Sequence, residues 1–156
     1  MSAEVSVKLV QVADYRFAIH YQDSAPPLPG DEPPPLGQSQ GATPSQFLAA
    51  AVGNCLSDSL LFALRKFKQN PDPIETIARC VIGRNSENRL RIVDIYVDIQ
   101  IGALGSTIDN LDRALAQFQD FCTVSSSVSL GIPVHVAVQD KNGTQLYPLI
   151  SQSKAE

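Results

Sequence analysis

The sequence lacks the features that mark an exported or membrane-spanning protein. It begins Met1-Ser2-Ala3-Glu4-Val5, without the positive start and apolar stretch of a secretory signal. Its longest uncharged apolar run, around residues 47–56, is much shorter than the roughly 20 residues that a membrane span needs. We therefore expect a cytoplasmic protein that has no transmembrane helix and no membrane partner.

Residues that bind metals or form disulfide frameworks are also few. The chain has three cysteines and two histidines, with no Cys-x-x-Cys or His-x-x-x-His spacing, and His20 and His135 are 115 positions apart. A zinc site is therefore not expected, and no other cofactor is predicted. An odd number of cysteines without an export signal favours free thiols in a reducing compartment over structural disulfides.

Basic clusters are absent as well. The formal net charge is -4, and the twelve basic residues are scattered along the chain, so nucleic acid is not an expected partner. The 156 residues, of which 44% are hydrophobic and 18% charged, fit one globular domain over 1–156 with a flexible tail at 151–156.

The first 42 residues predict a hairpin followed by a loop. Val5, Val7 and Leu9 alternate with polar residues, and a second alternating run over 15–21 follows a turn near Ala13-Asp14. Residues 24–42 then contain six prolines and three glycines, a composition that disfavours both helix and strand. We expect an irregular loop there, long enough to have a functional role.

A long helix is predicted from Pro44 to about Gln69. Thr43 is a good N-cap, Pro44 suits the first helical position, and Gln46 completes a capping box. Residues 47–53 are apolar on all sides, so this part should be buried all round, and Cys55 lies in mid-helix. Such a helix needs more cover than one small sheet gives, and a second subunit could supply it.

The remaining chain predicts an α+β fold with mostly antiparallel strands. The strand at 91–102 alternates most clearly, and Ser106 is the expected cap of the helix that follows it. Gly131 should end a short third helix, and Asn142-Gly143 should form a tight turn. The predicted strands are 77–84, 91–102, 132–138 and 145–150, and the predicted helices are 106–121 and 123–130.

The cysteines are the candidates for chemistry, since a thiol reacts as the thiolate and needs a positive environment to form it. Cys122 directly precedes Thr123, where the free amides of a helix start could stabilise negative charge. Cys55 would need a cation from elsewhere, and Arg16 is the only arginine before residue 65. From their spacing alone, all three cysteines could instead be small buried hydrophobic residues without a chemical role. This is the interpretation we adopt for Cys80.

Two motifs resemble a known family. Residues 41–55, GATPSQFLAAAVGNC, look like the start of the central helix of the osmotically inducible protein C and organic hydroperoxide resistance family. Residues 121–125, FCTVS, with Gly131-Ile132-Pro133-Val134, look like its second cysteine motif. Asp31-Glu32-Pro33 with Leu36-Gly37 resembles the loop before the helix. The two cysteines stand 67 residues apart in the family order.

The resemblance implies a homodimer in which sheets from both subunits wrap the central helices. It also implies a thiol peroxidase that acts on small apolar organic hydroperoxides: Cys55 is oxidised to a sulfenic acid, Cys122 resolves it as a disulfide, and an external dithiol reduces the disulfide. Arg16 corresponds in approximate location to the activating arginine of the family.

The sequence departs from the family at two positions. Ser45 stands where the family's peroxidases carry a glutamate that orients the arginine, and Thr123 stands where the residue after the second cysteine is usually proline. A neutral Ser45 cannot form that ion pair. The alternative function is therefore a non-catalytic dimeric scaffold that binds a small apolar ligand, or a redox sensor, at the same pocket.

Overall fold

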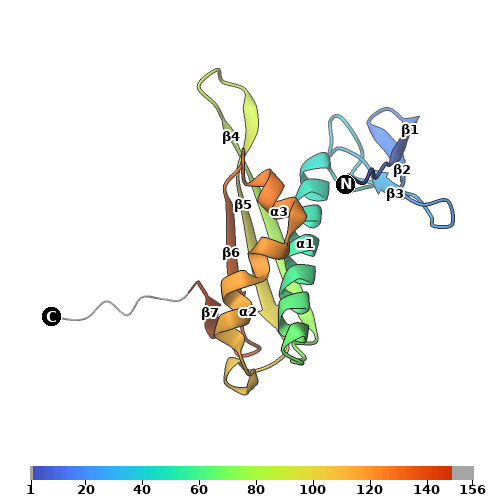
Figure 1. Ribbon diagram of the computed structural model, residues 1–156. Coiled ribbons are helices and arrows are strands. Elements are labelled where there is room, and N and C mark those ends of the chain that lie inside the picture. Colours follow the sequence, from blue (N-terminus) through green and yellow to red (C-terminus); the bar gives the residue numbers. More distant parts are fainter. Residues whose placement is uncertain (1, 149–156) are drawn as a thin grey trace. The chain divides into compact units, whose positions relative to one another are not determined.

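The computed structural model describes residues 2–148, which belong to two compact units, Met1–Leu48 and Ala49–Glu156. The first unit contains a three-stranded antiparallel sheet in the order β1-β2-β3 (Figure 1). Its strands are β1 Lys8–Ala13, β2 Arg16–His20 and β3 Leu28–Gly30. Asp14, with φ of 47°, makes the turn between β1 and β2, so the predicted hairpin is confirmed.

The prediction of an irregular loop over 24–42 is wrong in part, because β3 lies within it. Pro29 pairs with Ala18 of β2, although proline has no amide to give to a ladder. The Pro29 carbonyl accepts a hydrogen bond from the Ala42 amide at 3.1 Å, and the Asp31 amide donates to the Ala42 carbonyl. A proline is tolerated here because β3 is short and at the edge of the sheet.

The long helix α1, Pro44–Lys66, begins as the sequence predicts. The Gln46 amide donates to Thr43 Oγ1 at 3.2 Å, and the Thr43 amide donates to Gln46 Oε1 at 2.9 Å, so both bonds of the capping box form. The helix ends three residues before the predicted Gln69, because Lys68 turns to a positive φ of 59°. The Gln69 amide then bonds back to the Leu64 carbonyl.

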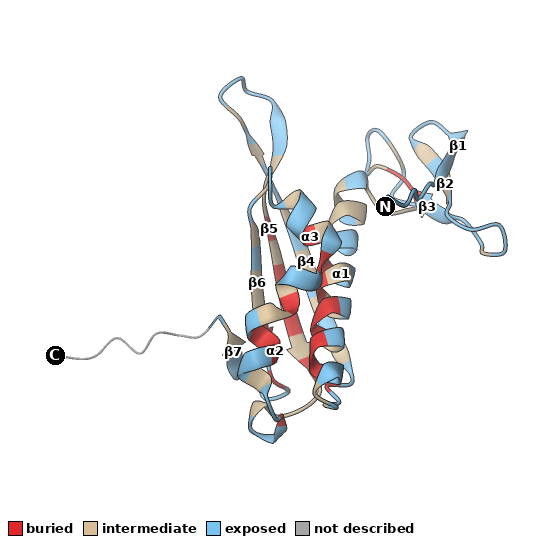
Figure 2. Ribbon diagram, viewed as in Figure 1, coloured by how far each residue is buried: buried red, intermediate tan, exposed pale blue. Residues whose placement is uncertain are grey.

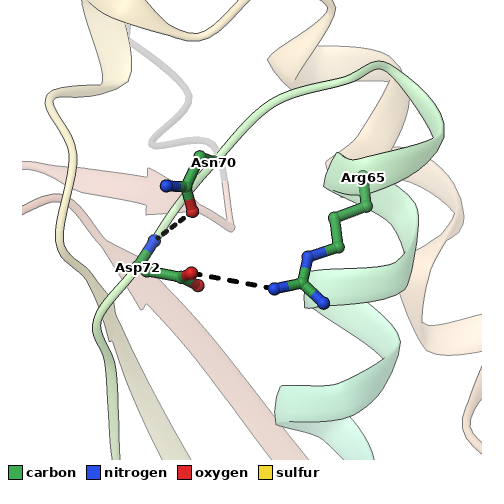
Figure 3. Close-up of polar contacts among 3 residues, drawn as sticks. All are labelled: Arg65, Asn70 and Asp72. Atoms are coloured by element: carbon green, nitrogen blue, oxygen red, sulfur yellow. Dashed lines mark hydrogen bonds and ion pairs between the residues drawn. The ribbon is translucent and has the colours of Figure 1, made fainter.

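Polar side chains shape the segment after α1 (Figure 3). The Asp72 amide donates to Asn70 Oδ1 at 3.2 Å, and Arg65 lies 3.7 Å from the Asp72 carboxylate. Both members of this ion pair are more than half exposed, so it adds little to stability.

The second unit contains a four-stranded sheet in the order β4-β5-β6-β7. All pairs are antiparallel except β5 with β6, which run parallel because the chain crosses between them through helices on one face of the sheet (Figure 1). The elements are β4 Ile74–Arg84, β5 Leu90–Ile101, α2 Leu111–Gln117, α3 Thr123–Val128, β6 Val134–Gln139 and β7 Gln145–Tyr147, with short 3₁₀ helices at Gly105–Thr107 and Phe118–Phe121.

The core lies between this sheet and the helices (Figure 2). Alternate residues of β5 point into it, as the predicted period of two requires, and α1 contributes a row of leucines. The residues at most 1% exposed in these two elements include Ile95, Val97, Ile99, Ile101, Leu56, Leu60 and Leu64.

The prediction that α1 is buried all round between residues 47 and 53 is wrong for the single chain. Val52 and Gly53 are buried, but Ala50 and Ala51 are exposed, as is Asn54 in the next turn.

Among residues 2–148, α1 is the one helix whose length and hydropathy would allow it to cross a membrane, a test that the core helices of soluble proteins also pass. Leu56, Leu60 and Leu64 of this helix pack into the protein core.

The predicted helix over 106–121 is also divided. Ser106 lies inside a 3₁₀ turn and does not cap a helix. Ile108 follows in an extended conformation with its side chain 8% exposed, so burial of this residue interrupts the helix before α2 starts after Asn110. The tight turn at Asn142-Gly143 is confirmed, with Gly143 at φ of 81°. The predicted end of the last strand and the predicted tail at 151–156 lie outside the described residues.

Candidate active site

Cys122 lies at the start of α3, as the sequence predicts. It is the N-cap residue, with φ of -89° and ψ of 96°, and its Sγ accepts a hydrogen bond from the Ser125 amide at 3.3 Å. The thiol therefore takes the place that a serine or aspartate oxygen usually has at a helix start. Its side chain is 0% exposed, so solvent does not reach it directly.

Cys55 lies in mid-helix on α1, and its thiol meets the same helix start. The Cys122 thiol is its hydrogen-bond partner, and the amides of Val124 and Ser125 also point to it. Unlike Cys122, Cys55 is only partly buried. The structure thus brings together the two cysteines that the sequence motifs single out and leaves one of them accessible.

The environment of Cys55 has opposing effects on its acidity. Burial raises the pKa of the Cys55 thiol, and the hydrogen bond and charge of the neighbouring Cys122 thiol raise it further. The amides of Val124 and Ser125 oppose this, but the net pKa remains above the usual value. A cation near Cys55 would therefore be needed to make it a strong nucleophile at neutral pH.

Sequence reasoning did not find the Val124 and Ser125 amides as partners of Cys55. Their placement depends on α3 packing against α1, a contact between segments almost 70 residues apart. The available signal was the position of Cys122 directly before a predicted helix start, because any thiol that meets Cys122 also meets those amides.

The packing of α1 on β4 fixes the position of Cys55. Gly53 faces Ala78, where an added Cβ would be 3.0 Å from the Ala78 methyl, so the helix and the strand approach closely. One turn further on, the Ser57 hydroxyl bonds to the Thr76 hydroxyl at 2.6 Å. This close contact between α1 and β4 is possible because residue 53 is glycine.

Cys80 is the third thiol and lies on β4. It is partly buried, with the Ala49 amide of α1 near its sulfur. Burial raises the pKa of the Cys80 thiol, and the Ala49 amide offsets this only in part. These surroundings match those of a packing residue better than those of a nucleophile.

Arg16 belongs to the first unit, where it begins β2 and is half-buried. Its Nη1 donates a hydrogen bond to Gln40 Oε1. The Gln40 amide in turn donates to the buried carboxylate of Asp31 at 3.0 Å. Neither Gln40 nor Asp31 was identified as a functional residue from the sequence, although the Asp31-Glu32-Pro33 motif marked this loop.

His135 takes part in a surface cluster on the sheet. Its ring stacks on Tyr96 with centroids 4.6 Å apart, and Nε2 lies 2.8 Å from Asp94 Oδ1. The Arg79 guanidinium lies over the Tyr96 ring and forms an ion pair with Asp98.

Over residues 2–148, no group of three or more His, Cys, Asp or Glu side chains is arranged to hold a metal ion.

The fold and the site define an α+β protein in which a long central helix carries one thiol against a second thiol at a helix start. The family model of OsmC-like proteins matches residues 37–137, which include both cysteines. The chain belongs to the OsmC-like protein family.

Solved structures show the same fold. An OsmC-like protein of unknown function from Vibrio cholerae aligns with a TM-score of 0.74 and 15% identity over 88% of this chain and 100% of that one. An organic hydroperoxide resistance protein from Elizabethkingia anophelis aligns at 0.69 and 15% over 90% and 99%. Another from Bacillus subtilis aligns at 0.65 and 15% over 86% and 98%. No curated protein matches the sequence.

Proposed function

We propose that the chain is a two-cysteine peroxidase that reduces small apolar organic hydroperoxides. The observation that carries this proposal is the contact between the partly exposed Cys55 thiol and the fully buried Cys122 thiol. The partial exposure of Cys55 and the full burial of Cys122 support attack by Cys55 and resolution by Cys122. Family membership and the fold shared with organic hydroperoxide resistance proteins support a peroxide-related role.

The reaction has three steps. The Cys55 thiolate attacks the outer oxygen of the hydroperoxide, the O–O bond breaks, and the alcohol leaves after taking up a proton. The Cys122 sulfur then attacks the Cys55 sulfenic acid, which forms a disulfide and releases water. An external dithiol reduces the disulfide by exchange and is itself oxidised. Such a dithiol pool places the reaction in the cytoplasm, which is part of the proposal.

Arg16 is the proposed cation for Cys55. The pKa of the Cys55 thiol is raised by burial and by Cys122, so a guanidinium beside the sulfur would favour the thiolate. A homodimer is also proposed, because β1 leaves Leu9 and Val12 more than half exposed and α1 leaves Phe62 55% exposed. Sheets of a partner subunit would cover these side chains.

A second function has support from one residue. Ser45, at the start of α1, is neutral where the peroxidases of the family carry a glutamate. Without that glutamate, and with the pKa of the Cys55 thiol raised, the thiol pair is less activated. A less activated pair is compatible with a scaffold that binds an apolar ligand or senses oxidants. The two functions differ in turnover, which only the peroxidase has.

A steady-state assay with cumene hydroperoxide and dithiothreitol separates them. The wild type should consume many equivalents of hydroperoxide, and Cys55→Ser should consume none. When dithiothreitol is left out, Cys122→Ser should stop at the Cys55 sulfenic acid, whereas the wild type should stop at the Cys55–Cys122 disulfide, since the variant has no resolving thiol. Cys80→Ser is the matched control and should turn over like the wild type. No turnover by the wild type, or equal loss in Cys80→Ser and Cys55→Ser, would refute the peroxidase.

A further inference from the structure

The 3₁₀ helix Phe118–Phe121 leads directly into Cys122 and so determines where this thiol lies. The Cys122 amide donates a hydrogen bond to the Gln119 carbonyl at 3.0 Å, which couples the backbone positions of the two residues. Whatever holds Gln119 in place therefore also holds Cys122 beside Cys55.

The side chain of Gln119 is held by Tyr147 of β7. Gln119 Nε2 donates a hydrogen bond to the Tyr147 hydroxyl at 2.6 Å. The Tyr147 ring also meets the Phe118 ring edge to face, with centroids 5.6 Å apart and an angle of 87° between the ring planes. Phe118 is fully buried, so this contact ties Tyr147 to the core. Tyr147 thus contacts two successive residues of the 3₁₀ helix, one through its hydroxyl and one through its ring.

The rest of the surroundings leaves Tyr147 room to move. β7 has three residues, and Tyr147 pairs with Val138 of β6. A cavity of about 170 Å³ between α2 and β7 borders Tyr147. Packing therefore does not enclose the ring on the cavity side. The position of the side chain depends on its hydrogen bond to Gln119 and its contact with Phe118.

The position of Cys122 matters most when it forms a disulfide. The Cys122 and Cys55 thiols are hydrogen-bond partners, and a disulfide requires a shorter distance and a narrower range of angles. A segment that is already held in place loses little freedom when the bond closes, so it forms a disulfide more readily than a loose segment.

From these contacts we propose that Tyr147 is a positioning residue that acts through Gln119 and aligns Cys122 for disulfide formation with Cys55. The Tyr147 hydroxyl fixes Gln119, and the Gln119 carbonyl fixes the backbone of Cys122. This inference rests on the part of the proposed function that pairs Cys122 with Cys55. It gives β7, a strand without a cysteine, a role in the thiol chemistry.

The test measures the equilibrium between the full-length protein and a buffer of reduced and oxidised glutathione, with the products resolved by peptide mass spectrometry. The Cys55 and Cys122 thiols give two electrons and two protons to oxidised glutathione, which forms the protein disulfide and two molecules of reduced glutathione. Tyr147→Phe removes only the hydroxyl and should lower the equilibrium constant for the protein disulfide about threefold. Tyr147→Leu also removes the ring contact with Phe118 and should lower it about tenfold.

Tyr96→Phe is the matched control. It removes a hydroxyl from the same unit but keeps the ring that stacks on His135, so it should give the wild-type equilibrium constant. A loss in Tyr96→Phe as large as that in Tyr147→Phe would show that the effect is not specific to Tyr147 and would overturn the inference.

A double-mutant cycle shows whether Tyr147 acts through Gln119. Gln119→Leu removes the partner of the Tyr147 hydroxyl and should lower the equilibrium constant as Tyr147→Phe does. The double variant should show no further loss, because both single changes remove the same hydrogen bond. Losses that add in the double variant would overturn the inference.

Urea unfolding of the reduced and the oxidised forms separates positioning from a merely structural role. A structural role would destabilise both forms equally and leave the glutathione equilibrium at the wild-type value. A wild-type equilibrium constant in both Tyr147→Phe and Tyr147→Leu would therefore overturn the inference, whatever their stability.

The outcome is separate from that of the peroxidase assay, because the glutathione equilibrium needs no hydroperoxide. Hydroperoxide turnover by the wild type, together with an unchanged equilibrium in the Tyr147 variants, would remove the inference and leave the proposed function standing. A lowered equilibrium constant in Tyr147→Phe without turnover by the wild type would support the positioning role and refute the peroxidase.

Discussion

Replacing Gly53 with alanine tests the close contact between α1 and β4 that sets the position of Cys55. Two opposing effects decide the result. Alanine in a helix interior is about 1 kcal/mol more favourable than glycine. The new Cβ would lie 3.0 Å from the Ala78 Cβ and 3.5 Å from Thr76 Cγ2, and the first distance is well inside carbon–carbon contact.

The steric effect should be the larger of the two. The Ala78 methyl is attached directly to the β4 backbone and cannot rotate away, so the helix or the strand must move. Overpacking of this kind costs about 1–3 kcal/mol. After subtraction of the helix-propensity gain, Gly53→Ala should lower the free energy of unfolding by about 1 kcal/mol.

Urea unfolding of Gly53→Ala, Ala78→Gly and the double variant measures this directly. Removing the Ala78 methyl makes room for the new Cβ and relieves the whole steric cost, so the double variant should be about 2 kcal/mol more stable than the sum of the single effects predicts. A Gly53→Ala protein that is stabilised by about 1 kcal/mol, with no coupling to Ala78→Gly, would show that the helix and strand do not approach closely.

Three further predictions concern charge and assembly. Asp31→Asn should destabilise the protein at neutral pH but not in acid. The folded-state pKa of Asp31 is lowered, so the carboxylate stabilises the fold above the usual pKa near 3.8, and this contribution is lost as the pH falls through the folded-state pKa. A difference in unfolding free energy between wild type and Asp31→Asn that does not change with pH in urea titrations would contradict this. Ser45→Glu should raise the rate of hydroperoxide consumption by adding a second partner for Arg16, and an unchanged or lower rate would count against that role. Light scattering at micromolar concentration should give the mass of a dimer, whereas a monomer of 16.8 kDa would refute the covering of β1 and α1 by a partner.

Local signals in the sequence predicted the elements that depend on neighbouring residues. The capping box of Thr43 and Gln46 requires only four consecutive positions, and both of its hydrogen bonds form. The alternation along β5 likewise gives its buried face directly. The cap position of Cys122 followed from the same kind of pattern.

Features that depend on distant segments were missed. Ser106 has the chemistry of a helix cap, but burial of Ile108 in an extended conformation interrupts the helix. The prolines of residues 24–42 argue against a strand, but the edge position of β3 accepts Pro29. The amides that meet Cys55 come from α3, so no pattern around residue 55 could reveal them.

The most direct test of the two-thiol account is mass spectrometry of the protein after treatment with one equivalent of cumene hydroperoxide. The contact between the two thiols predicts a Cys55–Cys122 disulfide in the wild type, with Cys80 still reduced. In Cys122→Ser, Cys55 should instead be found as sulfenic or sulfinic acid. If Cys55 and Cys122 both stay reduced in the wild type after prolonged exposure, the peroxidase mechanism is wrong and the ligand-binding scaffold is the better account.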